Sequence, residues 1–216
     1  TYFYIIAGGY QGQKGIGITN KEKYKRMFGR ASKTGIDVDG EKIGNIPSIE
    51  WKAKKFPSDP WRLGDTYHTA IGQYGFQVTP VQMVRAVAGI GSKGTLVTPH
   101  IFKDIDPSLL SIQTLDIDQA NYTVIHEGMR QVVTAGTGGA LNISNVEIAA
   151  KTGTAQVGIS KKAINSWVIG FFPYENPKYA FTVLMENSPS SNKIGASQAM
   201  GELFRWMALY TPEYFK

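Results

Sequence analysis

The chain has 216 residues, of which 42% are apolar, 12% are aromatic and 19% are charged. Disordered chains have few aromatic residues and a high density of charge, so this composition excludes them and indicates a folded chain with a hydrophobic core. The 23 basic residues exceed the 17 acidic residues and give a net charge of +6. This mild excess favours contact with an anionic surface but does not establish nucleic-acid binding, and we expect no nucleic-acid partner.

Cysteine is absent, which excludes disulfide bonds, thiolate zinc sites and a cysteine nucleophile in this chain. No apolar run approaches the ~20 residues that a membrane-spanning helix needs. The chain starts inside an aromatic segment, Thr1 to Tyr4, without an initiator Met or a signal peptide. We therefore expect a fragment or processed piece of a longer protein.

The first third of the chain indicates short helices and loops. The apolar residues 2–7 predict a buried helix, and Thr19 and Asn20 are suited to cap a second helix over 21–28. Glycine and proline interrupt residues 29–66, which are therefore predicted to form a loop.

The clearest helix signal follows. Thr79 is a good N-cap, Pro80 suits the first helical position and Gln82 completes a capping box. The glycines at Gly91 and Gly94 are expected to end this helix.

The second half of the chain is predicted to contain two more helices and a sheet. The helices cover 118–134 and 196–209, and the strands cover 146–157, 166–172 and 179–186. Because the strands follow one another and helices lie on both sides in sequence, the predicted class is α+β, with an antiparallel sheet flanked by helices.

The sharpest chemical signal is the run Lys151-Thr152-Gly153-Thr154 on the first of these strands. Gly153 has no Cβ, so a substrate backbone can lie against the strand edge as an added strand. The amide of Thr154 can stabilise a developing oxyanion. The hydroxyls of Thr152 and Thr154 can bind a carboxylate, and Lys151 can supply positive charge. Because neighbouring residues face opposite sides of a strand, Lys151 or Thr152 must reach across the edge to serve one site.

The Lys-Thr-Gly tripeptide alone is a weak signal, and its sequence context strengthens it. The supporting blocks are 35–37, 44–47, 50–51, 61–66, 70–73, 78–83, Gly94 with 98–100, and 148–156. In combination they resemble the class B penicillin-binding proteins, and within them the penicillin-binding protein 2 subgroup that serves cell elongation. The resemblance runs from Thr1 to about Leu209. It implies a fold shared with the serine β-lactamases, in which residues 1–216 form the C-terminal part of a single transpeptidase domain.

The resemblance also implies which residues act. It makes Lys151 and Thr154 catalytic, and it makes Lys151, Thr152, Gly153 and Thr154 substrate-binding. It implies that the turn at 136–139 flanks the active-site cleft. The nucleophilic serine, its lysine base and the S-x-N or S-x-D motif are expected upstream, outside this chain. No metal and no cofactor are expected.

A second run, Ser190-Ser191-Asn192-Lys193, matches both S-x-x-K and S-x-N by letter. It follows the Lys-Thr-Gly strand, whereas the family places both motifs before it. Serine and asparagine are also common in turns and helix caps. We therefore interpret this run as a loop or cap and not as a nucleophile.

Other polar residues give weaker signals. His68, His100 and His126 lack the spacing and the carboxylate neighbours of a metal site, so we expect them at the surface or the edge of the core, with any role of His68 left open. The run of three lysines, Lys52, Lys54 and Lys55, is interpreted as a solvated face. Binding to anionic cell-wall polymers or lipid headgroups is the less favoured alternative.

The function implied by the resemblance is that of a peptidoglycan D,D-transpeptidase. Such an enzyme forms an acyl-serine from a D-Ala-D-Ala stem peptide, releases D-Ala, and passes the acyl group to a neighbouring amine, and β-lactams trap the acyl-enzyme. One alternative is a serine β-lactamase, against which the subgroup-like blocks between residues 35 and 66 argue. Another is an inactive penicillin-recognising sensor or scaffold.

The resemblance implies partners and a location as well. The expected partners are peptidoglycan stem peptides, β-lactam antibiotics, the upstream part of the same protein, and the membrane glycosyltransferase and scaffold proteins of an elongation complex. The expected location is the periplasmic side of the bacterial inner membrane, held there by an N-terminal helix that is absent from this chain.

Overall fold

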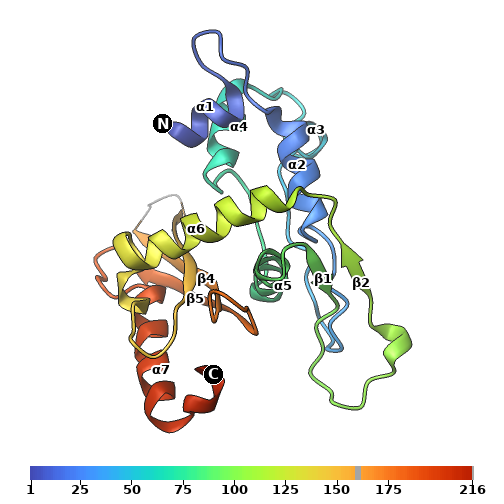
Figure 1. Ribbon diagram of the computed structural model, residues 1–216. Coiled ribbons are helices and arrows are strands. Elements are labelled where there is room, and N and C mark those ends of the chain that lie inside the picture. The colour runs from blue at the N-terminus through green and yellow to red at the C-terminus, as the bar shows by residue number, and fades with distance from the viewer. Residues whose placement is uncertain (159–161, 216) are drawn as a thin grey trace.

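The computed structural model describes residues 1–158 and 162–215 and has an α+β architecture, in agreement with the sequence prediction (Figure 1). The elements before the main sheet are α1 (Tyr2–Gly8), α2 (Gly17–Met27), α3 (Ile49–Lys55), α4 (Leu63–Ala70), α5 (Pro80–Gly91), β1 (Thr95–Val97), η1 (Pro107–Leu109), β2 (Ile112–Thr114), α6 (Gln119–Ala135) and η2 (Gly139–Leu141). The remaining elements are β3 (Ala149–Val157), β4 (Ala163–Phe172), β5 (Tyr179–Pro189), α7 (Ala196–Tyr210) and η3 (Pro212–Phe215).

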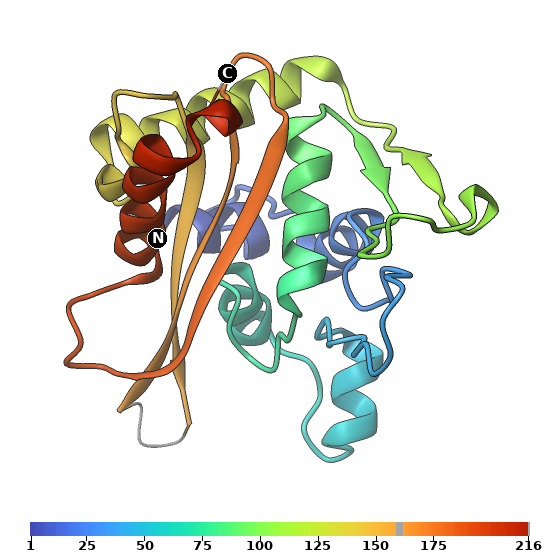
Figure 2. The ribbon, with the colours of Figure 1, turned by 90° about the horizontal axis from the view of Figure 1, so that it is seen from below.

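The main sheet is antiparallel with strand order β3-β4-β5, as the three strand signals predict. Figure 2 shows α7 on one side of this sheet and α5 on the other. Phe172, Met200 and Phe204 join the core on the α7 side. Val87 and Phe171 join the core on the α5 side. Because successive residues of a strand face opposite sides, Phe171 and Phe172 serve different cores.

The capping box of α5 is confirmed. Thr79 Oγ1 accepts from the Gln82 N–H at 3.2 Å, and Gln82 Oε1 accepts from the Thr79 N–H at 3.0 Å. The amide of Gln82 also donates to the carbonyl oxygens of Ser32 and Ile43. The buried side chain of Gln82 therefore caps the N-terminus of α5 and also binds the preceding loop to this helix.

The predicted boundaries of the later helices are close to those observed. Asp118 is the N-cap of α6 and accepts from the Ala120 N–H at 2.8 Å. The last helix, α7, begins at Ala196 as predicted and ends at Tyr210. Both helices have an apolar face that packs on the sheet. Because such a face repeats at helical spacing in the sequence, their position and length could be predicted.

Three expectations for the N-terminal third are wrong. Residues 2–7 are helical but only in part buried, since Ala7 is 2% exposed whereas Tyr2 is 69% exposed and Phe3 is 58% exposed. The second helix begins at Gly17, so Thr19 and Asn20 lie inside it and cap nothing. Residues 29–66 are not all loop, because they contain α3 and the start of α4.

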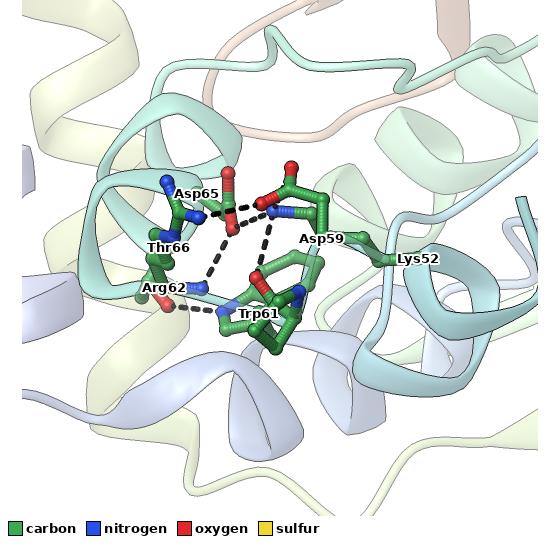
Figure 3. A network of polar contacts seen from close by, with 7 residues as sticks. Lys52, Asp59, Trp61, Arg62, Asp65 and Thr66 are labelled. Carbon is green, nitrogen blue, oxygen red and sulfur yellow. Dashed lines mark hydrogen bonds and ion pairs between the residues drawn. The ribbon is translucent and has the colours of Figure 1, made fainter. Parts of the chain in front are cut away.

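The expected solvated face of lysines is wrong for Lys52, whose side chain is 2% exposed. Figure 3 shows its ammonium between Asp59 and Asp65. The distances from Nζ are 2.7 Å to Asp65 Oδ2, 2.9 Å to Asp59 Oδ2 and 3.0 Å to the Pro60 carbonyl oxygen. Asp65 Oδ2 also accepts from the backbone N–H of Arg62 at the start of α4. The network thus ties α3 to α4.

Burial acts to lower the pKa of Lys52, but the hydrogen bonds to Asp65 and Asp59 outweigh it and raise that pKa above its usual value. Burial acts to raise the pKa of Asp65, but the hydrogen bonds from Lys52 and from the backbone of Arg62 outweigh it and lower that pKa. Both groups are therefore held in their charged forms, as a paired buried charge requires.

Within residues 1–158 and 162–215, every helix is too short or too polar to cross a lipid bilayer.

Candidate active site

The Lys-Thr-Gly run lies on β3, which pairs with β4 along one edge. Thr152 is opposite Val168 and Thr154 is opposite Ser166, so the two threonines share the face that α7 covers. Lys151 is opposite Ile169, which belongs to the core on the α5 side. The structure therefore separates Lys151 from the threonine side chains, as strand alternation predicts.

The Lys151 side chain does not cross to the threonine face. It is exposed, and its Nζ donates to the backbone carbonyl oxygen of Thr152 at 2.6 Å. The backbone groups of Thr154 point in the same direction as those of Thr152, because the two residues are two positions apart in a strand. The ammonium of Lys151 and the amide N–H of Thr154 therefore lie on the same edge of β3.

A pocket of about 390 Å³ opens beside this strand, and β3 and β4 form one of its walls. The strand residues that line it are Thr152, Gly153, Thr154, Ser166 and Trp167. Three of the four predicted site residues thus come together in one cavity, and Lys151 lies outside its lining.

The turn after α6 and the segment leading into α7 form the other wall. They contribute Thr137, Ala140, Lys193, Gly195, Ser197 and Gln198. Thr137 Oγ1 lies 2.5 Å from Thr152 Oγ1, so a hydrogen bond joins the turn to β3. The turn at 136–139, which was expected to flank the active-site cleft, thus contributes Thr137 to the lining of this pocket.

The segment Ser190–Lys193 is a turn and loop between β5 and α7, as expected. The Ser190 N–H donates to the Lys162 carbonyl oxygen at 2.8 Å, and Asn192 Oδ1 accepts from the Ile194 N–H at 3.0 Å. Sequence reasoning nevertheless missed Lys193 as a residue that lines the pocket. Its only sequence signal was the letter match that we set aside, and nothing local singles out Ser166, Ser197 or Gln198.

The three histidines lie where the sequence predicts. His68 is exposed on α4, and His100 Nδ1 is 2.9 Å from the Phe102 carbonyl oxygen. His126 is buried at the core edge, 2.7 Å from the Ile90 carbonyl oxygen and against the ring of Phe171. In the part of the chain that the structure describes, no group of three histidine, aspartate or glutamate side chains could hold a metal ion.

A second group of titratable side chains lies on α2, away from the pocket. Burial lowers the pKa of Lys21 to about 8. Burial, with the nearby charges of Lys21 and Arg30, lowers the pKa of Lys25 to about 7. The Lys21 ammonium donates to the hydroxyl of Thr69, and the Lys25 ammonium lies 4.0 Å above the ring of Phe76.

Comparison with known families decides the identity. Residues 6–205 match the family model described as the penicillin binding protein transpeptidase domain. The chain belongs to this family. It spans about a third of the length of the curated relatives that it matches.

The relatives fit the same subgroup. The chain is 33% identical to the peptidoglycan D,D-transpeptidase MrdA of Haemophilus influenzae, over 92% of this chain and 33% of that protein. Penicillin-binding protein PBP2 of Helicobacter pylori, solved in complex with MreC, aligns with a TM-score of 0.80 at 32% identity, over 99% of this chain and 38% of that one. PBP2 of Pseudomonas aeruginosa, in complex with WCK 5153, aligns with a TM-score of 0.78 at 32% identity, over 95% and 46%.

Proposed function

We propose that this chain supplies the substrate-binding part of a peptidoglycan D,D-transpeptidase that works through an acyl-serine. The observation that supports this most is the stretch of β3 where Thr152, Gly153 and Thr154 line a polar pocket. An edge strand can receive an extended peptide, and hydroxyls beside it can bind the terminal carboxylate of that peptide.

In the proposed reaction, a serine outside this chain attacks the carbonyl carbon of the penultimate D-Ala, and a lysine base takes the serine proton. The amide N–H of Thr154 stabilises the oxyanion of the tetrahedral intermediate. The carbon–nitrogen bond then breaks, the leaving nitrogen takes up a proton, and D-Ala departs. A neighbouring stem-peptide amine attacks the acyl-serine, forms the new amide and restores the serine.

The side chains of the run have separate proposed roles, in addition to the role of the Thr154 amide. Lys151 carries positive charge toward the serine–lysine pair, which favours a neutral lysine base. Thr152 and Thr154 orient the carboxylate by hydrogen bonds, and Gly153 leaves room for the substrate backbone. β-Lactams carry an equivalent carboxylate and would acylate the same serine.

The test uses the full-length protein that contains this chain. Purified protein is incubated with labelled penicillin, the acylated residue is mapped by mass spectrometry, and D-Ala release and cross-linking are assayed with a stem-peptide donor and an amine acceptor. We expect a long-lived adduct on a serine upstream of Thr1, together with cross-linking. This chain alone should form no adduct.

The other outcomes contradict the proposal in different ways. Rapid hydrolysis of the acyl-enzyme would indicate a serine β-lactamase. A stable adduct without cross-linking would indicate a sensor. An adduct on Ser190 would overturn the loop interpretation of that segment and the assignment of the nucleophile to the upstream part.

The setting of this reaction is proposed on the same basis. The H. pylori relative was solved with MreC, which supports a scaffold protein of the elongation complex as a partner, beside a membrane glycosyltransferase. We propose a location on the periplasmic side of the inner membrane, where stem peptides are cross-linked. Labelling of the full-length protein in intact and permeabilised cells with a membrane-impermeant reagent checks this location.

A further inference from the structure

The pocket beside β3 takes its charge from an unexpected residue. Lys151 is on the opposite face of the strand and does not line the pocket. Of the described residues that do line it, Lys193 alone carries a charge. Lys193 is therefore the cationic residue that lines the same pocket as Thr152 and Thr154.

Hydrogen bonds on both sides of Lys193 fix its backbone. On one side, the Asn192 N–H donates to the Pro189 carbonyl oxygen at 2.9 Å. On the other side, the Gly195 N–H donates to Gln198 Oε1 at 3.1 Å, and the Ala196 N–H donates to Ser166 Oγ at 3.0 Å. The bond from Ala196 joins the start of α7 to Ser166 on β4, the residue that is paired with Thr154.

The charge that lines the pocket is positive. Lys193 takes part in none of the ion pairs found in residues 1–158 and 162–215. The N-terminal end of α7 lines the same cavity and adds the partial positive charge of the helix dipole. A carboxylate that enters this pocket is surrounded by hydroxyl-bearing residues, Thr152 and Thr154 among them, by one cationic residue and by the N-terminal end of a helix.

We propose that Lys193 is a specificity-determining residue, whose ammonium attracts and holds the terminal carboxylate of the donor peptide or β-lactam while Thr152 and Thr154 orient it. This inference rests on the proposed transpeptidase function. It divides two tasks between two lysines: Lys193 acts on binding, and Lys151 acts on the chemistry of acylation. A contact of equal strength in the ground state and the transition state changes KM and leaves the maximal rate unchanged.

The experiment measures acylation of the full-length protein by benzylpenicillin and by its carboxyl methyl ester, which lacks the negative charge. For Lys193→Ala we expect a drop of roughly tenfold in the second-order acylation rate for the acid, since the lost contact is one charge-assisted hydrogen bond. The ester should change less than about twofold. Lys193→Glu should lower the rate for the acid further, and Lys193→Arg should restore most of it.

Two comparisons make the result specific. Lys54→Ala removes the same charge from an exposed position on α3 and should leave both probes unaffected. For the acid, the Lys193→Ala defect should be a higher half-saturating concentration, whereas Lys151→Ala should lower the maximal rate. Added salt should weaken acylation of the wild type by the acid and have little effect in Lys193→Ala.

Equal effects of Lys193→Ala on the acid and the ester, or no effect on either, would overturn the role of Lys193 while acylation of the wild type still supports the transpeptidase function. No acylation of the wild type by either probe would overturn that function and this inference with it. Thermal unfolding of each variant verifies that the exposed loop substitution leaves the fold intact.

Discussion

Thr137 Oγ1 and Thr152 Oγ1 are joined by a hydrogen bond of 2.5 Å, which links the turn after α6 to the middle of the Lys-Thr-Gly run. The bond fixes the rotamer of a side chain that we propose binds substrate. It also means that the position of Thr152 depends on a residue that is 15 positions away in sequence.

The first prediction separates direct binding from positioning. Thr152→Val removes a hydroxyl that we propose binds the substrate carboxylate and should lower the acylation rate by about 10- to 100-fold, since hydrogen bonds to charged groups contribute roughly 1.5–3 kcal/mol. Thr137→Val removes only the positioning bond and should cost about fivefold. Stopped-flow acylation of the full-length protein measures both, and a larger loss for Thr137→Val than for Thr152→Val would contradict the assignment.

The second prediction concerns Gly153. A Cβ built on Gly153 meets only the Cβ of Trp167, at 3.7 Å, which is an ordinary contact. The fold therefore accepts alanine here, and Gly153→Ala should raise or leave unchanged the free energy of unfolding, because glycine in a strand costs about 0.5–1 kcal/mol relative to alanine. Acylation should nevertheless fall, since the added methyl group obstructs a peptide lying on the strand.

Gly170 on β4 is the matched comparison. A Cβ on Gly170 would lie 2.5 Å from the Ala149 carbonyl oxygen and 2.5 Å from a ring carbon of Phe181. Gly170→Ala should therefore destabilise the fold by roughly 1–3 kcal/mol through overpacking. Chemical denaturation distinguishes the two variants, and a destabilised Gly153→Ala with normal acylation would show that this glycine serves the fold.

The third prediction concerns Lys151. Lys151→Ala should slow acylation by roughly 10²-fold, as expected for the loss of one electrostatic catalytic contact. Its side chain is exposed, so the thermal unfolding temperature should barely change. Lys151→Arg keeps the charge without the compact geometry and should recover part of the rate. Acylation of Lys151→Ala at the wild-type rate would make Lys151 a solvated strand residue.

The fourth prediction concerns the buried ammonium of Lys52 and its ion pairs in Figure 3. Lys52→Met leaves the carboxylate of Asp65 without its cation and should destabilise the fold by roughly 3–5 kcal/mol. Asp59 is 46% exposed, so Asp59→Asn should cost less than about 1 kcal/mol. Lys54→Met on the exposed side of α3 is the control. Similar unfolding free energies for Lys52→Met and Lys54→Met would contradict the role of the network.

The fifth prediction is a pH dependence from α2. The folded pKa of Lys25 is about 7, below its usual value of 10.5, so between these values the unfolded chain binds more protons than the folded chain. The free energy of unfolding should therefore rise with pH across this window, by at most about 1.4 kcal/mol per pH unit from this group. Lys21 should add to the rise from about pH 8 upward.

Lys25→Met should reduce this slope and stabilise the fold at pH 7, because it removes a buried charge near Lys21 and Arg30. Lys23→Met, on the exposed side of the same helix, should leave the slope unchanged. Urea denaturation from pH 6 to pH 10 provides the measurement. Identical slopes in the wild type and Lys25→Met would show that this ammonium is well solvated in the folded protein.

The elements that were predictable from sequence are those whose causes are local. Thr79 and Gln82 lie three residues apart and make their capping box with each other. The apolar faces of α6 and α7 repeat at helical spacing, and Val146, Ile148 and Ala150 alternate with the residues between them as the chain leads into the Lys-Thr-Gly run. In each case the residues that determine the element are contained within it.

The failures involve partners that are far apart. The local sequence predicts that Lys52 is a surface lysine, because its partner Asp65 is 13 residues away and meets it only in the folded chain. The apolar run 2–7 gives a helix, but its period cannot reveal that Tyr2 and Phe3 face solvent. Lys193 reaches the pocket because the path from β5 to α7 returns past β3, which is a property of topology and not of local pattern.

The edge of β3 has a consequence for encounters between molecules. Among residues 1–158 and 162–215, β4 is the only strand that pairs with β3, and an unpaired edge is a template for any extended chain, including the same edge of a second copy. The proposed substrate and a second copy of the chain would therefore compete for one row of backbone groups on β3. Concentrated protein should form edge-to-edge dimers that a saturating strand-like ligand disperses, so that occupancy of the edge sets the colloidal stability of the solution.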